Sequence, residues 1–149
     1  MSDAVTADIT IDAPVEKVWE TVMDPDRLGD WVTIHKKLVS ADSGPPKQGM
    51  HMKQSLHLRG ATFKVSWELE ECKPCKLAKW EGSGPARSSA RTEYHLSENA
   101  DGGTDFHYVN EFKAPGGALG KAASKALVGG LPKREAEKSL AQLKRLLEK

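Results

Sequence analysis

Hydrophobic and polar residues alternate along much of this chain, with the two-residue period of a strand that has one buried face. The first alternating run covers residues 5–11, and Asp12-Ala13-Pro14 ends it. After it, apolar spacings of three and four predict an amphipathic helix with one buried stripe: Val15, Val18, Trp19 and Val22. Asp24-Pro25 ends this helix, and a short second helix is predicted over Asp26–Trp31.

Alternation then continues for about eighty residues, interrupted by groups of glycine, proline and aspartate that delimit about six further strands. Strands joined by short turns predict an antiparallel meander with one wet face and one face on a core. The interruptions are Gly44-Pro45-Pro46, Gly60, Lys73-Pro74, residues 82–85 and Asp101-Gly102-Gly103.

Within these strands one parity is mostly apolar, so that parity should face the core and the other should face water. The predicted inward set is Met50, Met52, Gln54, Leu56, Leu58, Phe63, Val65, Trp67, Leu69, Ala78, Trp80, Thr92, Tyr94, Leu96, Phe106, Tyr108, Asn110 and Phe112. The predicted outward set includes His51, Lys53, Ser55, His57, Arg59, Arg91, Glu93, His95, His107 and Glu111.

The C-terminal part, from Leu119 onward, has helical periodicity. Two adjacent glycines cost about 2 kcal/mol relative to alanine in a helix interior, so Gly129-Gly130 predicts a break or kink. The clearest apolar stripe lies beyond this break and consists of Ala136, Leu140, Leu143 and Leu147. We expect one domain over residues 1–149.

Charge and composition narrow the function classes. The 149 residues carry 22 Lys plus Arg against 21 Asp plus Glu, a net charge of +1, which gives no global reason to expect nucleic-acid binding. From Leu119 onward eight Lys and Arg face three Glu, which is typical of a solvated helix face. No run approaches the ~20 apolar residues of a membrane span, and MSDAVTADIT lacks a secretory signal, so we expect a cytoplasmic protein.

Several motifs, in this order, resemble one family. Residues 9–19, Ile-Thr-Ile-Asp-Ala-Pro-Val-Glu-Lys-Val-Trp, followed by Asp24 and Trp31, resemble the opening of the START-like (SRPBCC) superfamily. Gly102-Gly103-Thr104 leading into residues 109–112 and Pro115-Gly116 is similar to the last strand and exit loop of its polyketide cyclase/dehydrase branch. The resemblance implies an α+β helix-grip (Bet v 1-like) fold. In it a curved antiparallel sheet of about seven strands surrounds a long C-terminal helix, with two short helices after the first strand.

The helix-grip fold implies a cavity between sheet and helix for a lipid, polyketide or other apolar molecule. Five polar residues share the inward parity, and a few polar groups in an apolar wall are typical of a small-molecule pocket. Hydrogen-bonded core residues would give the same pattern. The candidate ligand-binding residues are Trp31, His35, Gln54, Trp67, Trp80, Thr92, Tyr94, Tyr108 and Asn110. We expect a non-catalytic binding protein that uses neither cofactor nor metal, as monomer or homodimer.

Polyketide aromatase, cyclase or dehydrase activity is the first alternative. The resemblance implies that such catalysis depends on an arginine that projects into the cavity, and strand alignment from Gly60 places Leu69 there. A leucine cannot stabilise an enolate. His35, Tyr94 and Tyr108 are the remaining acid–base candidates, so the catalytic residues stay unassigned.

The string Trp31–Lys37 is similar to small actinobacterial members of the superfamily, one of which is described as the toxin of a toxin–antitoxin pair. A toxin with an antitoxin protein partner is therefore the second alternative.

Two other groups of residues could in principle bind metal or undergo redox chemistry, but their positions favour ordinary structural roles. Cys72-Lys73-Pro74-Cys75 has redox or zinc spacing, but it flanks a predicted turn between strands, without the helix N-terminus or the second cysteine pair that such sites use. The oxidation state of this pair stays open. Four histidines share the outward parity and are expected to be solvated rather than metal ligands: His51, His57, His95 and His107.

Overall fold

The computed structural model describes residues 3–58, 60–84, 88–113 and 133–148. Within these ranges, seven strands and four helical segments follow one another in the predicted order. They are β1 (Asp3–Ile11), α1 (Val15–Val22), η1 (Pro25–Arg27), α2 (Leu28–Trp31), β2 (His35–Ala41), β3 (His51–Leu58), β4 (Ala61–Lys73), β5 (Leu77–Ser83), β6 (Ser89–Glu98), β7 (Thr104–Lys113) and α4 (Lys133–Leu147).

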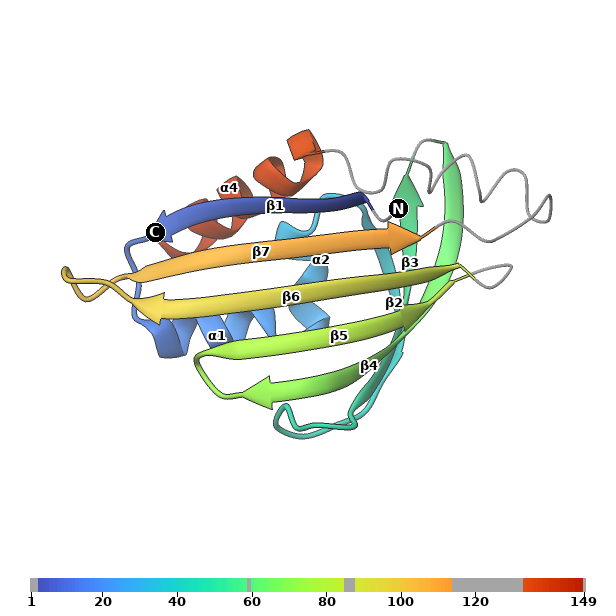
Figure 1. The fold of residues 1–149 in the computed structure, drawn as a ribbon, viewed down its shortest axis with the longest axis horizontal. Coiled ribbons are helices and arrows are strands. Elements are labelled where there is room, and N and C mark those ends of the chain that lie inside the picture. The colour runs from blue at the N-terminus through green and yellow to red at the C-terminus, as the bar shows by residue number, and fades with distance from the viewer. Residues whose placement is uncertain (1–2, 59, 85–87, 114–132, 149) are drawn as a thin grey trace.

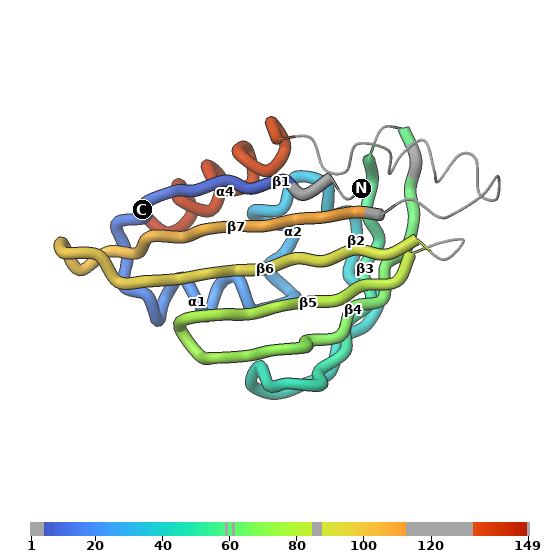
Figure 2. Tube along the Cα trace, in the orientation of Figure 1, coloured from blue at the N-terminus to red at the C-terminus, as the bar shows by residue number. Residues whose placement is uncertain are grey.

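All seven strands form a single antiparallel sheet in the order β1-β7-β6-β5-β4-β3-β2. The sheet curls, so that β2 and β3 stand across the direction of β5 to β7 (Figure 1). Helices α1, α2 and α4 lie together on its concave side, as the tube also shows (Figure 2). This curled sheet with its C-terminal helix confirms the predicted helix-grip fold.

The predicted inward residues of β3 to β7 are all buried, which confirms the parity analysis. Two predicted outward residues are also buried, contrary to expectation: Ser55 is 9% exposed and Glu111 is 8% exposed. Ser55 is a small residue registered between Lys37 and Lys64 on the neighbouring strands. Glu111 is registered opposite Arg91, with 3.8 Å between its Oε1 and the Arg91 Nη2. Arg59 lies outside the described residues.

Three register shifts and one close-packed glycine mark the curled part of the sheet. The register of β4 against β5 shifts between Leu69 and Glu71, and that of β2 against β3 shifts twice. Gly82 of β5 is registered opposite Trp67, and a Cβ there would lie 2.7 Å from the Trp67 ring. Glycine therefore lets the indole lie flat against β5.

The helices present the faces that their spacing predicts. Helix α1 buries Val18, Trp19 and Val22, whereas the predicted second helix divides into η1 and α2. The predicted stripe of α4 is buried, while the expected break at Gly129-Gly130 and the exit loop at Pro115-Gly116 lie outside the described residues. In the described ranges, no helix has the length and apolar character needed to cross a bilayer.

Candidate functional site

A cavity lies between the concave face of the sheet and the segment that joins α1 to β2. Its floor comes from β3 to β7, and its roof comes from the end of α1, η1, α2 and the residues that follow α2. Its walls are formed by Val22, Met23, Pro25, Leu28, Val32, Ile34, Met52, Gln54, Leu56, Trp67, Trp80, Thr92, Tyr94, Tyr108, Asn110 and Phe112.

One group of polar residues in the wall, which we call the Asn110 cluster, consists of Thr92, Tyr108 and Asn110. Asn110 lies directly opposite Thr92 in the β6–β7 pairing and two residues from Tyr108 on the same face. Its amide nitrogen donates hydrogen bonds to the Thr92 Oγ1 and to the Tyr108 Oη, each at 3.1 Å. Its amide oxygen is buried and has no hydrogen-bond partner among the described residues.

A second group, the Gln54 cluster, consists of His35, Gln54 and Trp67. The indole nitrogen of Trp67 donates to the Gln54 Oε1 at 2.7 Å. Because an indole N–H can only donate, this bond fixes the orientation of the amide. The Gln54 Nε2 therefore donates to the His35 Nδ1 at 2.8 Å, and His35 must be the neutral tautomer with its proton on Nε2.

Burial at His35 acts in the same direction as this hydrogen bond. Desolvation lowers the pKa of His35 below its ordinary value of 6.5, because burial disfavours the charged imidazolium. A proton added at Nδ1 would also face the Gln54 N–H and break the bond. The Gln54 cluster therefore favours an uncharged His35.

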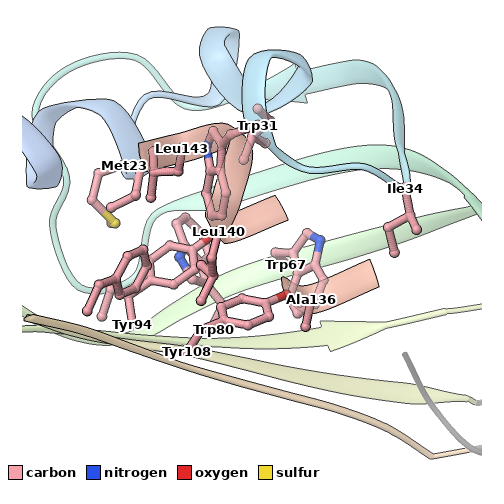
Figure 3. Packing of buried hydrophobic residues seen from close by; sticks show 14 of the residues in the cluster. Met23, Trp31, Ile34, Trp67, Trp80, Tyr94, Tyr108, Ala136, Leu140 and Leu143 are labelled. Carbon is pink, nitrogen blue, oxygen red and sulfur yellow. The ribbon is translucent and has the colours of Figure 1, made fainter. Parts of the chain in front are cut away.

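Aromatic rings pack together on the concave side of the sheet (Figure 3). Tyr94 and Tyr108 stack with their ring centroids 6.1 Å apart, and Trp31 from α2 meets the edge of Tyr94 at 5.8 Å. Burial raises the pKa of Tyr108 to about 12 and raises that of Tyr94 further. Both phenols are therefore neutral near pH 7 and too weakly acidic to serve as efficient proton donors there.

The cavity wall holds no charged side chain among the described residues. Leu69, at the position where the resemblance implies an arginine, is fully buried. Arg91 faces outward, with its Nε 3.3 Å from a carboxylate oxygen of Glu93. The described residues therefore offer no cation to stabilise an enolate inside the cavity.

The free space within the cavity is narrow. The free volume of the cavity is about 40 Å³, roughly three times what one water requires. Met23 and Met52 line this space, and methionine is the side chain that adapts most readily to a new neighbour. An aromatic ligand would enter by displacing such side chains and any water between them.

The structure brings together seven of the nine candidate ligand-binding residues. Gln54, Trp67, Trp80, Thr92, Tyr94, Tyr108 and Asn110 line the cavity. Trp31 and His35 do not line it: Trp31 packs against the ring of Tyr94, and His35 contacts the lining residue Gln54. Sequence reasoning missed the roof residues Met23, Pro25, Leu28, Val32 and Ile34. The only sequence signal for these residues was that they are apolar or proline and lie in or beside the short helices.

The other candidate chemical groups lie away from the cavity. The pair Cys72 and Cys75 lies at the connection between β4 and β5, as predicted, but only Cys72 precedes the turn, whereas Cys75 lies within it; both are free thiols. Burial raises the pKa of each thiol, and Glu16 and Glu20 raise that of Cys75 further. Across the described ranges, no three His, Cys, Asp or Glu side chains converge as ligands for a metal.

Comparison with solved structures gives matches along nearly the whole chain. A protein from Chromobacterium violaceum is 18% identical, with a TM-score of 0.69 and 99% of both chains covered. The Zhui aromatase/cyclase of Streptomyces sp. R1128 is 16% identical, with a TM-score of 0.70, 99% of this chain and 94% of that one covered. At these identities the likeness shows the fold alone.

A putative protein of the dynemicin biosynthetic locus is 22% identical, with a TM-score of 0.62. The match covers 98% of this chain and 47% of that one. The comparison with curated proteins gave no match. A family profile described as "Polyketide cyclase / dehydrase and lipid transport" matches residues 2–148.

Proposed function

The chain belongs to the polyketide cyclase / dehydrase and lipid transport family, and on this premise we propose that it binds a small hydrophobic or aromatic molecule without chemistry of its own. The occupied site is the cavity between the sheet and the α1–β2 segment, within one domain. The observation that carries the proposal is the wall itself, where aromatic and aliphatic side chains surround the amides of Gln54 and Asn110. Such walls are typical of ligand-binding pockets.

The character of the wall favours binding over catalysis. Aromatase or cyclase chemistry needs a group that stabilises developing negative charge, and the described lining residues are uncharged. The two buried tyrosines hold their protons too tightly to exchange them efficiently near pH 7. The likeness to an aromatase/cyclase structure therefore supports a shared fold more than a shared reaction. The toxin hypothesis stays a prediction from the Trp31–Lys37 string.

Native mass spectrometry tests this proposal. We expect protein purified from its own source to carry a small molecule at near one-to-one ratio, released when the chain unfolds. The variant Asn110→Phe, which fills the cavity, should be empty. Val109→Phe adds the same ring to the opposite face of the same strand, where Val109 is half-buried, and should retain the molecule. Equal loading of both folded variants would contradict binding in this cavity.

A further inference from the structure

The hydrogen atoms of the Asn110 cluster can be counted. Asn110 Nδ2 has two hydrogens, and both are used, one toward the Thr92 Oγ1 and one toward the Tyr108 Oη. The two hydroxyls thus act as acceptors for Asn110, which leaves their own hydrogens available to donate. Asn110 Oδ1 remains an acceptor without a partner among the described residues, in a side chain only 4% exposed.

An unpaired buried acceptor costs more free energy than an ordinary hydrogen bond contributes. A molecule that donates a hydrogen to Asn110 Oδ1 removes this cost. The hydroxyl hydrogens of Thr92 and Tyr108 lie in the same cluster and can donate to an acceptor on the ligand. A single hydroxyl group on the ligand satisfies both demands, because it donates and accepts at one atom.

The charge of the wall restricts the ligand further. No Lys, Arg, Asp, Glu or His lines the cavity in the part of the chain that the structure describes. The nearest titratable imidazole, His35, is separated from the cavity by Gln54. A carboxylate or a phosphate would lose its hydration without gaining a counter-charge, and burial of such an unpaired ion is strongly unfavourable.

We propose that the ligand is an uncharged molecule carrying a hydroxyl group, a phenol or an alcohol, whose oxygen docks on Asn110 and Tyr108. This inference rests on the proposed function, because it concerns the same cavity. It adds a selection rule: the ligand's hydroxyl is recognised as donor and acceptor together, whereas the corresponding ether and carboxylate are discriminated against. Fatty acids and other anionic lipids in their ionised form are thereby excluded.

Three ring compounds of similar size test the rule: 4-methylphenol, 4-methylanisole and 4-methylbenzoate. The first donates and accepts, the second only accepts, and the third is an anion near pH 7. Titration of the ¹⁵N-labelled protein, followed at the Trp67 indole resonance and the backbone amide resonance of residue 110, gives a dissociation constant for each. We expect the phenol to bind roughly tenfold more tightly than the ether, and the benzoate to bind most weakly.

Variants separate hydrogen-bond recognition from the size of the ring substituent. In Asn110→Leu, a near-isosteric change, the ratio between phenol and ether should fall to about one. Tyr108→Phe removes a donor that both compounds use, so both should weaken by similar factors and the ratio should persist. Val109→Leu serves as the matched control, since it puts the same side chain on the opposite face of the same strand, where Val109 is half-buried and does not line the cavity.

The outcomes distinguish the two claims. Binding of all three compounds with equal constants, or tightest binding of the benzoate, would overturn the hydroxyl rule and leave the proposed function standing. Failure of all three to perturb the Trp67 and Asn110 resonances at millimolar concentration would overturn the proposed function and the rule with it. A phenol-to-ether ratio unchanged in Asn110→Leu would also overturn the rule.

Discussion

Gln54 and Asn110 are both buried amides on the concave face of the sheet, and both line the same cavity. Their surroundings differ. The Gln54 oxygen accepts from Trp67 and its nitrogen donates to His35, whereas the Asn110 oxygen has no partner among the described residues. Within the described part of the chain, two buried side-chain amides thus differ in their hydrogen bonding: the Gln54 oxygen is paired and the Asn110 oxygen is not.

This difference indicates different roles for the two clusters. Buried polar groups in folded proteins are almost always hydrogen-bonded, and a fully paired group mainly fixes the shape of its surroundings. The Gln54 cluster therefore holds the Trp67 ring and the first residue of β2, His35, in place. The Asn110 cluster has an open acceptor and two available donors, which are the groups that a ligand can use.

The largest effect is expected where the Gln54 cluster is packed most tightly. In Gly82→Ala the new Cβ would lie 2.7 Å from the Trp67 Cε3 and 2.8 Å from the Val65 Cγ1. Neither neighbour is free to yield, because Trp67 is bonded to Gln54 and Val65 is buried. We expect a loss of about 1–3 kcal/mol in the free energy of unfolding, measured in urea.

Gly29→Ala is the matched control for this prediction. A Cβ at Gly29 lies 3.4 Å from the His35 ring, an ordinary contact, and alanine favours helix over glycine. This variant should be as stable as the natural chain or more so. Equal stability of Gly82→Ala and Gly29→Ala would show that the close approach of Trp67 to β5 is not a constraint.

A smaller effect is expected from pH, again at the Gln54 cluster. The pKa of His35 is lower in the folded protein than its ordinary value of 6.5, so the unfolded chain binds more protons as the solution becomes acidic. The resulting stability is present above pH 6.5 and is lost as the pH falls through the folded-state pKa. His35→Asn, whose side-chain oxygen can accept from Gln54 without titrating, should show a weaker dependence.

Thermal unfolding of both chains between about pH 8 and pH 5 measures this difference. The other four histidines are common to the two proteins, so the change in the gap between the two Tm values reports on His35 alone. Parallel curves would contradict the assignment of His35 as a neutral hydrogen-bond acceptor.

Sequence patterns predicted the face of each polar residue but not its partners. Strand periodicity places both Gln54 and Asn110 inward, because parity depends only on the chain's own alternation. Partners depend on register. Asn110 meets Thr92 directly across the β6–β7 pair, whereas Gln54 meets Trp67 diagonally.

The contact between His35 and Gln54 could not be predicted from the sequence either. It depends on the irregular pairing of β2, whose register shifts between His35 and Lys37, and no residue pattern in β2 marks that shift. The roof of the cavity was missed for a related reason. Its residues belong to short helical segments and the connections beside them, where spacing does not separate a lining residue from a core residue.

The central claim, that the Gln54 cluster stabilises the fold and the Asn110 cluster binds, is tested most directly by urea unfolding of Gln54→Leu and Asn110→Leu with and without 4-methylphenol. Gln54→Leu leaves the Trp67 N–H unpaired and should lose about 1–3 kcal/mol, yet the ligand should still raise its midpoint. Asn110→Leu should stay within about 1 kcal/mol of the natural chain, and the ligand should raise its midpoint clearly less than it raises that of the natural chain. The reverse order of stabilities, or equal stabilisation of both variants by the ligand, would contradict the claim.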